Sequence, residues 1–146
     1  MAFLDLIDNH DLVTAVYGSW PDFGGAYVVS ASLFPHSDRF PGEEPRQFDL
    51  VLHWWLGAPD FYPDAPIQYD TAELHRLLHF VFFLPEELRV RTFFCSNASI
   101  DALQFTTRGE QLDVECSGGF ELKLESLRAR VLTVTECDAY GDAIGT

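Results

Sequence analysis

The chain has 146 residues, of which 47% are hydrophobic and 14% aromatic. This size and composition predict one domain, residues 1–146, with a dense core, and they exclude a disordered chain. Nine Lys and Arg face 23 Asp and Glu, which gives a formal net charge of −14. Because DNA, RNA and anionic lipid all bind basic surfaces, the charge argues against nucleic-acid and membrane partners.

The acidic residues are concentrated in the N-terminal half. Residues 1–73 hold 12 acids and two bases, whereas residues 74–146 hold 11 acids and seven bases. This distribution favours one anionic face, which would attract a cationic partner.

Cysteine usage and the N-terminus indicate a compartment. Three widely spaced cysteines at 95, 116 and 137, without a C-x-x-C pair, predict reduced thiols and not a disulfide scaffold, a zinc ribbon or a redox site. The start MAFLDLIDNHDL carries acids from Asp5 onward, unlike a signal peptide, and no apolar run approaches the roughly 20 residues that span a bilayer. We therefore expect a cytoplasmic protein.

The N-terminal segment predicts the main helical element. Apolar residues recur at steps of three and four over residues 3–17, as in one amphipathic helix or two short helical pieces. Gly18 ends this pattern, and Pro21 forces Trp20 into an extended conformation.

The middle of the chain predicts strands and long loops. Residues 26–34 are rich in β-branched and aromatic side chains, and residues 47–56 alternate so that Trp54 and Trp55 point to opposite faces. Between them lies a turn-rich stretch with three prolines, and residues 57–70 form a second loop long enough to be functional or mobile.

Residues 71–84 carry conflicting signals. Asp70 and Glu73 resemble a helix capping box, but HFVFFL, closed by Pro85, is typical of a buried strand. We expect a strand over about 76–84, with at most one helical turn before it.

From Pro85 onward, short alternating runs separated by turn residues predict a meander of antiparallel hairpins. The expected total is seven or eight strands. The chain is therefore expected to be mainly β, near the α+β margin: an antiparallel sandwich or strongly curved sheet capped by a short N-terminal helix.

No motif for catalysis is present. The sequence has no G-x-S-x-G, no P-loop and no G-x-G-x-x-G. His75 and His79 would share a helix face, but in a strand they lie about 13 Å apart, too far to share an ion. We therefore predict no catalytic residue, no metal and no cofactor, and a protein that is not an enzyme.

Candidate binding residues are the acids and aromatics that exceed what a core needs. They are Glu43, Glu44, Trp55, Asp60, Phe61, Tyr62 and Asp64. If the second face of the 47–56 strand is open, Trp55 beside acids is an anchor for an Arg- or Lys-rich partner; if that face is covered, both tryptophans belong to the core. Asp60 and Asp64 could instead form the rim of a site for a glycan or a cation.

Residues 17–30, YGSWPDFGGAYVVS, carry a resemblance. They resemble the Y-x-x-W-P-S-F-H-D-A-E-V-x-S opening of a family of small bacterial immunity proteins of polymorphic toxin systems. FVFFLPEELRVRTFFCSNASIDALQF resembles that family's strand, turn, strand and Asn-containing loop, and FELKLESLRARVLTVTEC resembles its closing pair of strands. The resemblance covers most of residues 15–137, with W-P-x-F as its specific part.

The resemblance implies a protein that binds and occludes one cognate toxin, and many such toxins are basic nucleases. Where the family has His-Asp and then Glu, this chain has Gly24-Gly25 and then Tyr27, so no role of those polar residues carries over. Trp20, Pro21 and Phe23 remain, as a structural clamp between the helix and the first strand. The alternative is a small-molecule or glycan binding module that uses the aromatic 57–70 loop.

Overall fold

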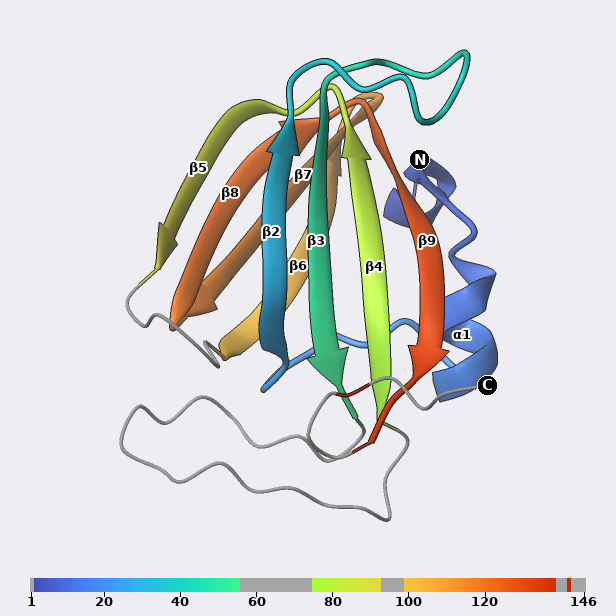
Figure 1. The fold of residues 1–146 in the computed structure, drawn as a ribbon, viewed down its shortest axis with the longest axis vertical. Coiled ribbons are helices and arrows are strands. Elements are labelled where there is room, and N and C mark those ends of the chain that lie inside the picture. The colour runs from blue at the N-terminus through green and yellow to red at the C-terminus, as the bar shows by residue number, and fades with distance from the viewer. Residues whose placement is uncertain (1, 56–74, 93–98, 139–141, 143–146) are drawn as a thin grey trace.

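Two β-sheets stack face to face in the computed structural model, which describes residues 2–55, 75–92, 99–138 and 142. Figure 1 shows one sheet of five strands, in the order β1-β9-β4-β3-β2, in front of one of four, β5-β8-β7-β6. The strands are β1 Ile7–Asp8, β2 Tyr27–Phe34, β3 Gln47–Trp54, β4 Arg76–Phe83, β5 Glu86–Thr92, β6 Ile100–Arg108, β7 Gln111–Gly118, β8 Phe120–Ser126 and β9 Arg128–Glu136. The predicted mainly β sandwich is confirmed.

The N-terminal segment forms two helical pieces beside β9 (Figure 1). They are a 3₁₀ helix, η1 Phe3–Leu6, and an α-helix, α1 Asp11–Tyr17. Gly18 ends α1 with a left-handed φ of 82°, a conformation that glycine adopts without steric cost. Among the described residues no helix is long and apolar enough to cross a membrane.

The ambiguous segment is a strand where the structure describes it. β4 begins at Arg76 and pairs antiparallel with both β3 and β9, so it lies inside the five-stranded sheet. The strands described exceed the expected number because β1, only two residues long, adds a parallel pairing with β9. A register so short leaves no sequence pattern to detect.

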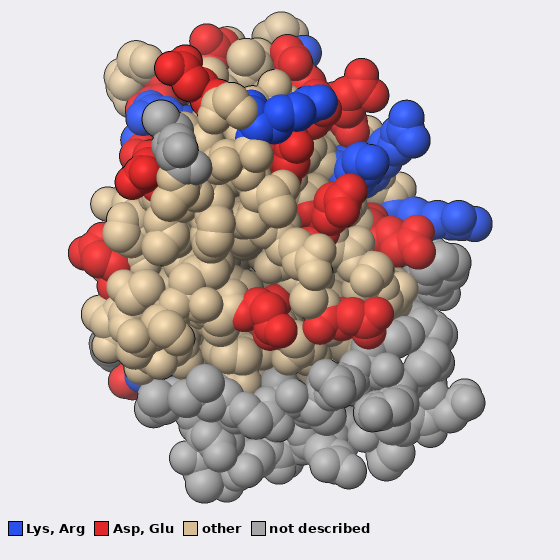
Figure 2. Space-filling model, turned by 180° about the vertical axis from the view of Figure 1, so that it is seen from behind, with Lys and Arg blue, Asp and Glu red and all other residues tan. Residues whose placement is uncertain are grey.

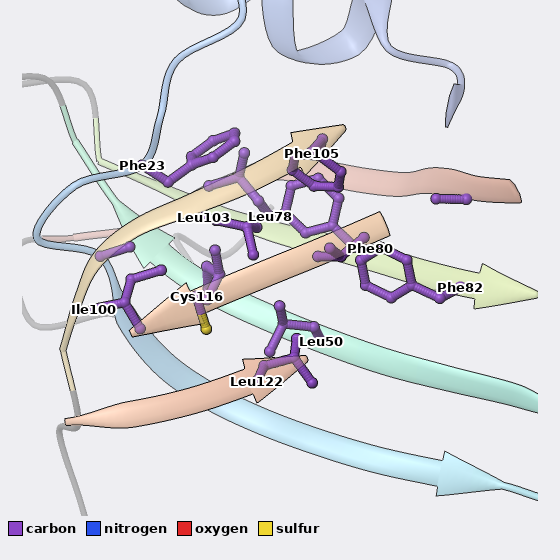
Figure 3. Close-up of a cluster of buried hydrophobic side chains, with 14 of the residues drawn as sticks. Phe23, Leu50, Leu78, Phe80, Phe82, Ile100, Leu103, Phe105, Cys116 and Leu122 are labelled. Atoms are coloured by element: carbon purple, nitrogen blue, oxygen red, sulfur yellow. The ribbon is translucent and has the colours of Figure 1, made fainter. Parts of the chain in front are cut away.

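The core fills the space between the sheets. Figure 3 shows side chains of both sheets meeting there, among them Leu50, Phe80, Leu103 and Leu122. Alternation places these residues on the inner faces, and each is at most 2% exposed. Together with the other members of the cluster they remove a continuous apolar surface from water, which is the main stabilising contribution to such a fold.

Trp20 and Phe23 connect the helical segment to this core. The Trp20 ring lies 5.7 Å from Phe23 and 5.5 Å from Phe105, both edge to face, and Phe23 lies 5.7 Å from Phe80. Edge-to-face rings at these separations attract one another beyond simple area burial. The W-P-x-F segment therefore acts through packing, between α1 and β2.

Replacing Phe80 by Ala should lower the free energy of unfolding by about 3–5 kcal/mol, because the cavity would be lined by side chains of both sheets. Urea denaturation measures this difference. Leu127→Ala is the matched control: Leu127 is exposed, so its change should stay within about 0.5 kcal/mol. Equal losses in the two variants would contradict the placement of Phe80 at the centre of the core.

Candidate functional site

The outer face of the five-stranded sheet carries a polar network at one end. Arg39 donates to both carboxylate oxygens of Asp49, from Nη1 to Oδ2 at 2.9 Å and from Nη2 to Oδ1, and from Nε to Gln47 Oε1 at 2.9 Å. His79 Nε2 lies 2.7 Å from Asp49 Oδ2. The Arg39 guanidinium also lies over the Phe34 ring, 4.2 Å from its centroid. These contacts fix the connection between β2 and β3 against the sheet.

Asp49 is the centre of this network. Its side chain is only 8% exposed. Burial opposes its ionisation, but hydrogen bonds from His79 and Arg39 outweigh that cost and hold the pKa of Asp49 below its ordinary value of 3.8. The carboxylate is therefore ionised at neutral pH and fully occupied by partners inside the protein.

A second ionic group anchors the same connection to β9. Glu43 accepts from Arg128 Nη2, and from Arg130 Nη2 at 2.9 Å, while Asp8 Oδ2 lies 3.1 Å from Arg128 Nη1. The hydrogen bond from Arg128 is the main cause that holds the pKa of Glu43 below its ordinary value. Figure 1 shows the β2–β3 connection reaching across the ends of β4 and β9, where these arginines lie.

The other end of this face holds a buried aromatic cluster. His53 Nε2 lies 2.9 Å from His75 Nδ1, and the Trp55 ring stacks on His75 with centroids 4.6 Å apart. Tyr27 lies beside both His53 and Trp55. Burial, together with the neighbouring His75, lowers the pKa of His53 to about 4. At neutral pH this pair is therefore packed with His53 uncharged.

The outer face of the four-stranded sheet is open and hollowed. A groove of about 700 Å³ runs across β5, β8, β7 and β6. Arg89, Lys123, Glu115 and Gln104 are register neighbours along one row of its lining. Figure 2 shows basic side chains in the upper half of this face and along one edge, with acidic side chains among and below them. The groove is thus mixed in charge.

The structure places only some of the candidate binding residues. Trp55 is 1% exposed, so it is no exposed anchor, and the alternative with both tryptophans buried is correct. The Glu43 side chain is 16% exposed and its carboxylate is engaged by two arginines, so it supports the fold and presents little to a partner. Glu44 is exposed. Asp60, Phe61, Tyr62 and Asp64 lie outside the described residues.

The two histidines considered as metal ligands each contact a different side chain. His75, the residue before β4, pairs with His53, whereas His79 of β4 pairs with Asp49. No group of three His, Cys, Asp or Glu able to hold a metal ion occurs in the described part of the chain. The Arg39–Asp49–His79 network was missed by sequence reasoning. Its one signal is that Gln47, Asp49 and His53 occupy alternate positions in an otherwise apolar strand.

Comparison of the chain with protein-family models, with curated proteins and with solved structures finds no match.

Asp49→Asn should destabilise the fold by about 1–3 kcal/mol, because the amide removes the negative charge beside Arg39 and replaces one of the two acceptor oxygens by an NH₂ group, which cannot accept a hydrogen bond. Chemical denaturation at pH 7 measures the change. Glu136→Gln is the control, since Glu136 is an exposed carboxylate paired with Arg76 and should contribute at most about 1 kcal/mol. An Asp49→Asn variant with unchanged free energy of unfolding would show that the network does not hold the β2–β3 connection.

Acidification should weaken the fold through His53. Between about pH 6.5 and pH 4 the unfolded chain binds a proton at this residue while the folded protein does not. The free energy of unfolding therefore decreases as the pH is lowered through this range. The loss should be of the order of 2 kcal/mol. Because acidification also changes charge repulsion elsewhere, the measurement is the stability difference between wild type and His53→Gln at each pH. This difference should narrow from pH 7 to pH 4; a constant difference would contradict the prediction.

Proposed function

We propose that the chain is a toxin-neutralising immunity protein that binds a cationic toxin domain and occludes it. The proposal rests on the resemblance of residues 17–30 to the immunity family and on the charge of −14. An inhibitor of this kind needs a complementary surface and a stable scaffold, and it needs no chemistry of its own. A β-sandwich with a buried core and an excess of acidic residues meets those needs.

The disposition of the cations is the observation that carries the proposal. Of the nine Lys and Arg, six form ion pairs with acids of the same chain: Arg39, Arg76, Arg108, Lys123, Arg128 and Arg130. These cations are therefore already matched within the protein. The surplus acids give the surface a negative potential that steers a basic domain toward it.

The connection between β2 and β3, residues 35–46, is the proposed contact segment. Its Asp38 and Glu44 are exposed, and they belong to the more acidic half of the chain. Arg39 and Glu43 of the same segment are held to the sheet and to β9. A segment fixed in this way loses little conformational freedom when a partner binds, which favours affinity.

The small-ligand alternative has less support. The loop residues proposed for it lie outside the described part of the chain. The described side chains that line the groove on the four-stranded sheet include no aromatic ring on which a sugar could stack. The groove therefore lacks the stacking surface for a sugar that the aromatic 57–70 loop was proposed to supply.

The test is co-expression of the tagged protein with the toxin C-terminal domain encoded immediately upstream of its gene. The two should co-purify, and the complex should weaken steeply between about 0.1 and 1 M salt because exposed charge pairs are screened over that range. Cells that die despite the protein, with no complex formed, would overturn the proposal.

A charge-matched pair of variants locates the interface. Asp38→Asn with Glu44→Gln should raise Kd for the toxin domain about tenfold. Glu86→Gln with Glu87→Gln removes the same number of charges from exposed positions on β5, and should raise Kd less than about threefold through the long-range field alone. Equal effects would show that the 35–46 segment is not the contact and that only net charge matters.

A further inference from the structure

β2 is an edge strand with unusual composition. It lies at the end of the five-stranded sheet, and no described strand pairs along its outer edge beyond the single bridge from Tyr27 to Ser99. Its sequence, YVVSASLF, has no charged residue, although 22% of the chain is charged. Every residue from 29 to 34 is exposed, with Val29 at 54% and Leu33 at 51%. An exposed edge without charges is a template for pairing with another strand.

The other described sheet edges are protected. β5 carries Glu86, Glu87, Arg89 and Arg91 and has a bulge between Glu86 and Arg89. β1 is two residues long, and β6 lies next to η1, where the Phe3 ring stacks on Phe105. Charges, bulges, short strands and covering elements are the means by which proteins block edge pairing. β2 has only one of these features, a bulge near its start between Val28 and Ser30.

We infer that β2 pairs antiparallel with β2 of a second copy of this chain, about a two-fold axis at Ala31. The segment Val29-Ser30-Ala31-Ser32-Leu33 is symmetric in side-chain size about its centre. An axis at Ala31 places Ser30 opposite Ser32 of the second copy, and it brings Val29, the residue that the bulge leaves without a register partner on β3, beside Leu33 of the second copy. Val29 and Leu33 then cover one another in both directions, which is the reciprocity that an isologous interface requires, and the small side chains of Ala31 meet at the axis.

A second copy suits this edge better than the cationic partner does. The strand offers a cation no carboxylate, whereas its symmetry of size matches its own sequence run in the opposite direction. The two copies carry −14 each, so repulsion opposes the pairing at low salt. Added salt screens this repulsion and strengthens apolar contact. The dimer therefore tightens with salt, opposite to the behaviour proposed for the toxin complex.

This dimer keeps the two proposed toxin surfaces apart. The β2–β3 connection follows the end of β2, so antiparallel pairing places the two connections at opposite ends of the joined strands. The inference goes beyond the proposed function and does not depend on it.

Sedimentation of the purified chain alone tests the inference. Over ~10–500 µM the protein should form a dimer whose Kd falls at least threefold between about 0.1 and 1 M salt. Leu33→Lys should raise Kd at least tenfold because it faces a cation toward the apolar Val29 of the second copy. Val90→Lys is the matched control on the β5 edge, where Val90 is 45% exposed, and should leave Kd within threefold. Circular dichroism checks that both variants are folded.

Disulfide formation tests the register. In a Cys95→Ser background the remaining native thiols, Cys116 and Cys137, are buried. Ala31→Cys should form a disulfide dimer under mild oxidation, since directly opposed strand residues have Cα atoms about 4.5–5.5 Å apart. Val90→Cys should not. A monomer throughout the concentration range at high salt, a dimer unaffected by Leu33→Lys, or cross-linking at position 90 in place of 31 would each overturn the inference.

Discussion

The structure depends on how an acidic chain uses its few cations. Arg39, Arg128 and Arg130 are placed on one face of the five-stranded sheet, where they meet Asp49, Glu43 and Asp8. Because each arginine donates several hydrogen bonds in a planar fork, one guanidinium can satisfy a carboxylate and a neighbouring acceptor together. Arg39 does so with Asp49 and Gln47. The face could not be covered by a polar connection without these partners, since an unpaired buried carboxylate is strongly destabilising.

Burial of both faces of β3 follows from this arrangement. Its inner residues, such as Leu50 and Leu52, pack in the sandwich core. On the outer face, Gln47 and Asp49 join the ionic network at one end of the strand and His53 joins the histidine–tryptophan cluster at the other. Polar side chains on the outer face of β3 would suggest that this face is exposed to solvent. Gln47, Asp49 and His53 are nevertheless all buried. Each has a hydrogen-bond partner within the chain, which is the condition for keeping such groups away from water.

The sequence was sufficient for the strands and insufficient for what covers them. Alternation located β2, β3 and the hairpins after Pro85, because the period of two is a local property of each segment. It also placed Trp54 and Trp55 on opposite faces, but it could not say whether the second face is open. That depends on residues outside the strand, such as Arg39, ten positions before Asp49, and His75, 22 positions after His53. The same non-locality hid the structural role of Glu43, whose partners lie more than 80 residues away.

The uncharged β2 edge is understandable in the same electrostatic terms. Edge strands are commonly protected by charge, and here the charge is absent from the strand but abundant on the rest of the molecule. Mutual repulsion between chains of −14 acts over about a Debye length, so at low ionic strength it opposes the approach of two copies without any charge on β2 itself. This repulsion acts between whole molecules and is screened by salt, whereas a lysine on β2 would block strand pairing at the edge itself. The same net charge that would attract a basic partner therefore opposes the approach of a second copy to the long uncharged edge that the described sheets leave open.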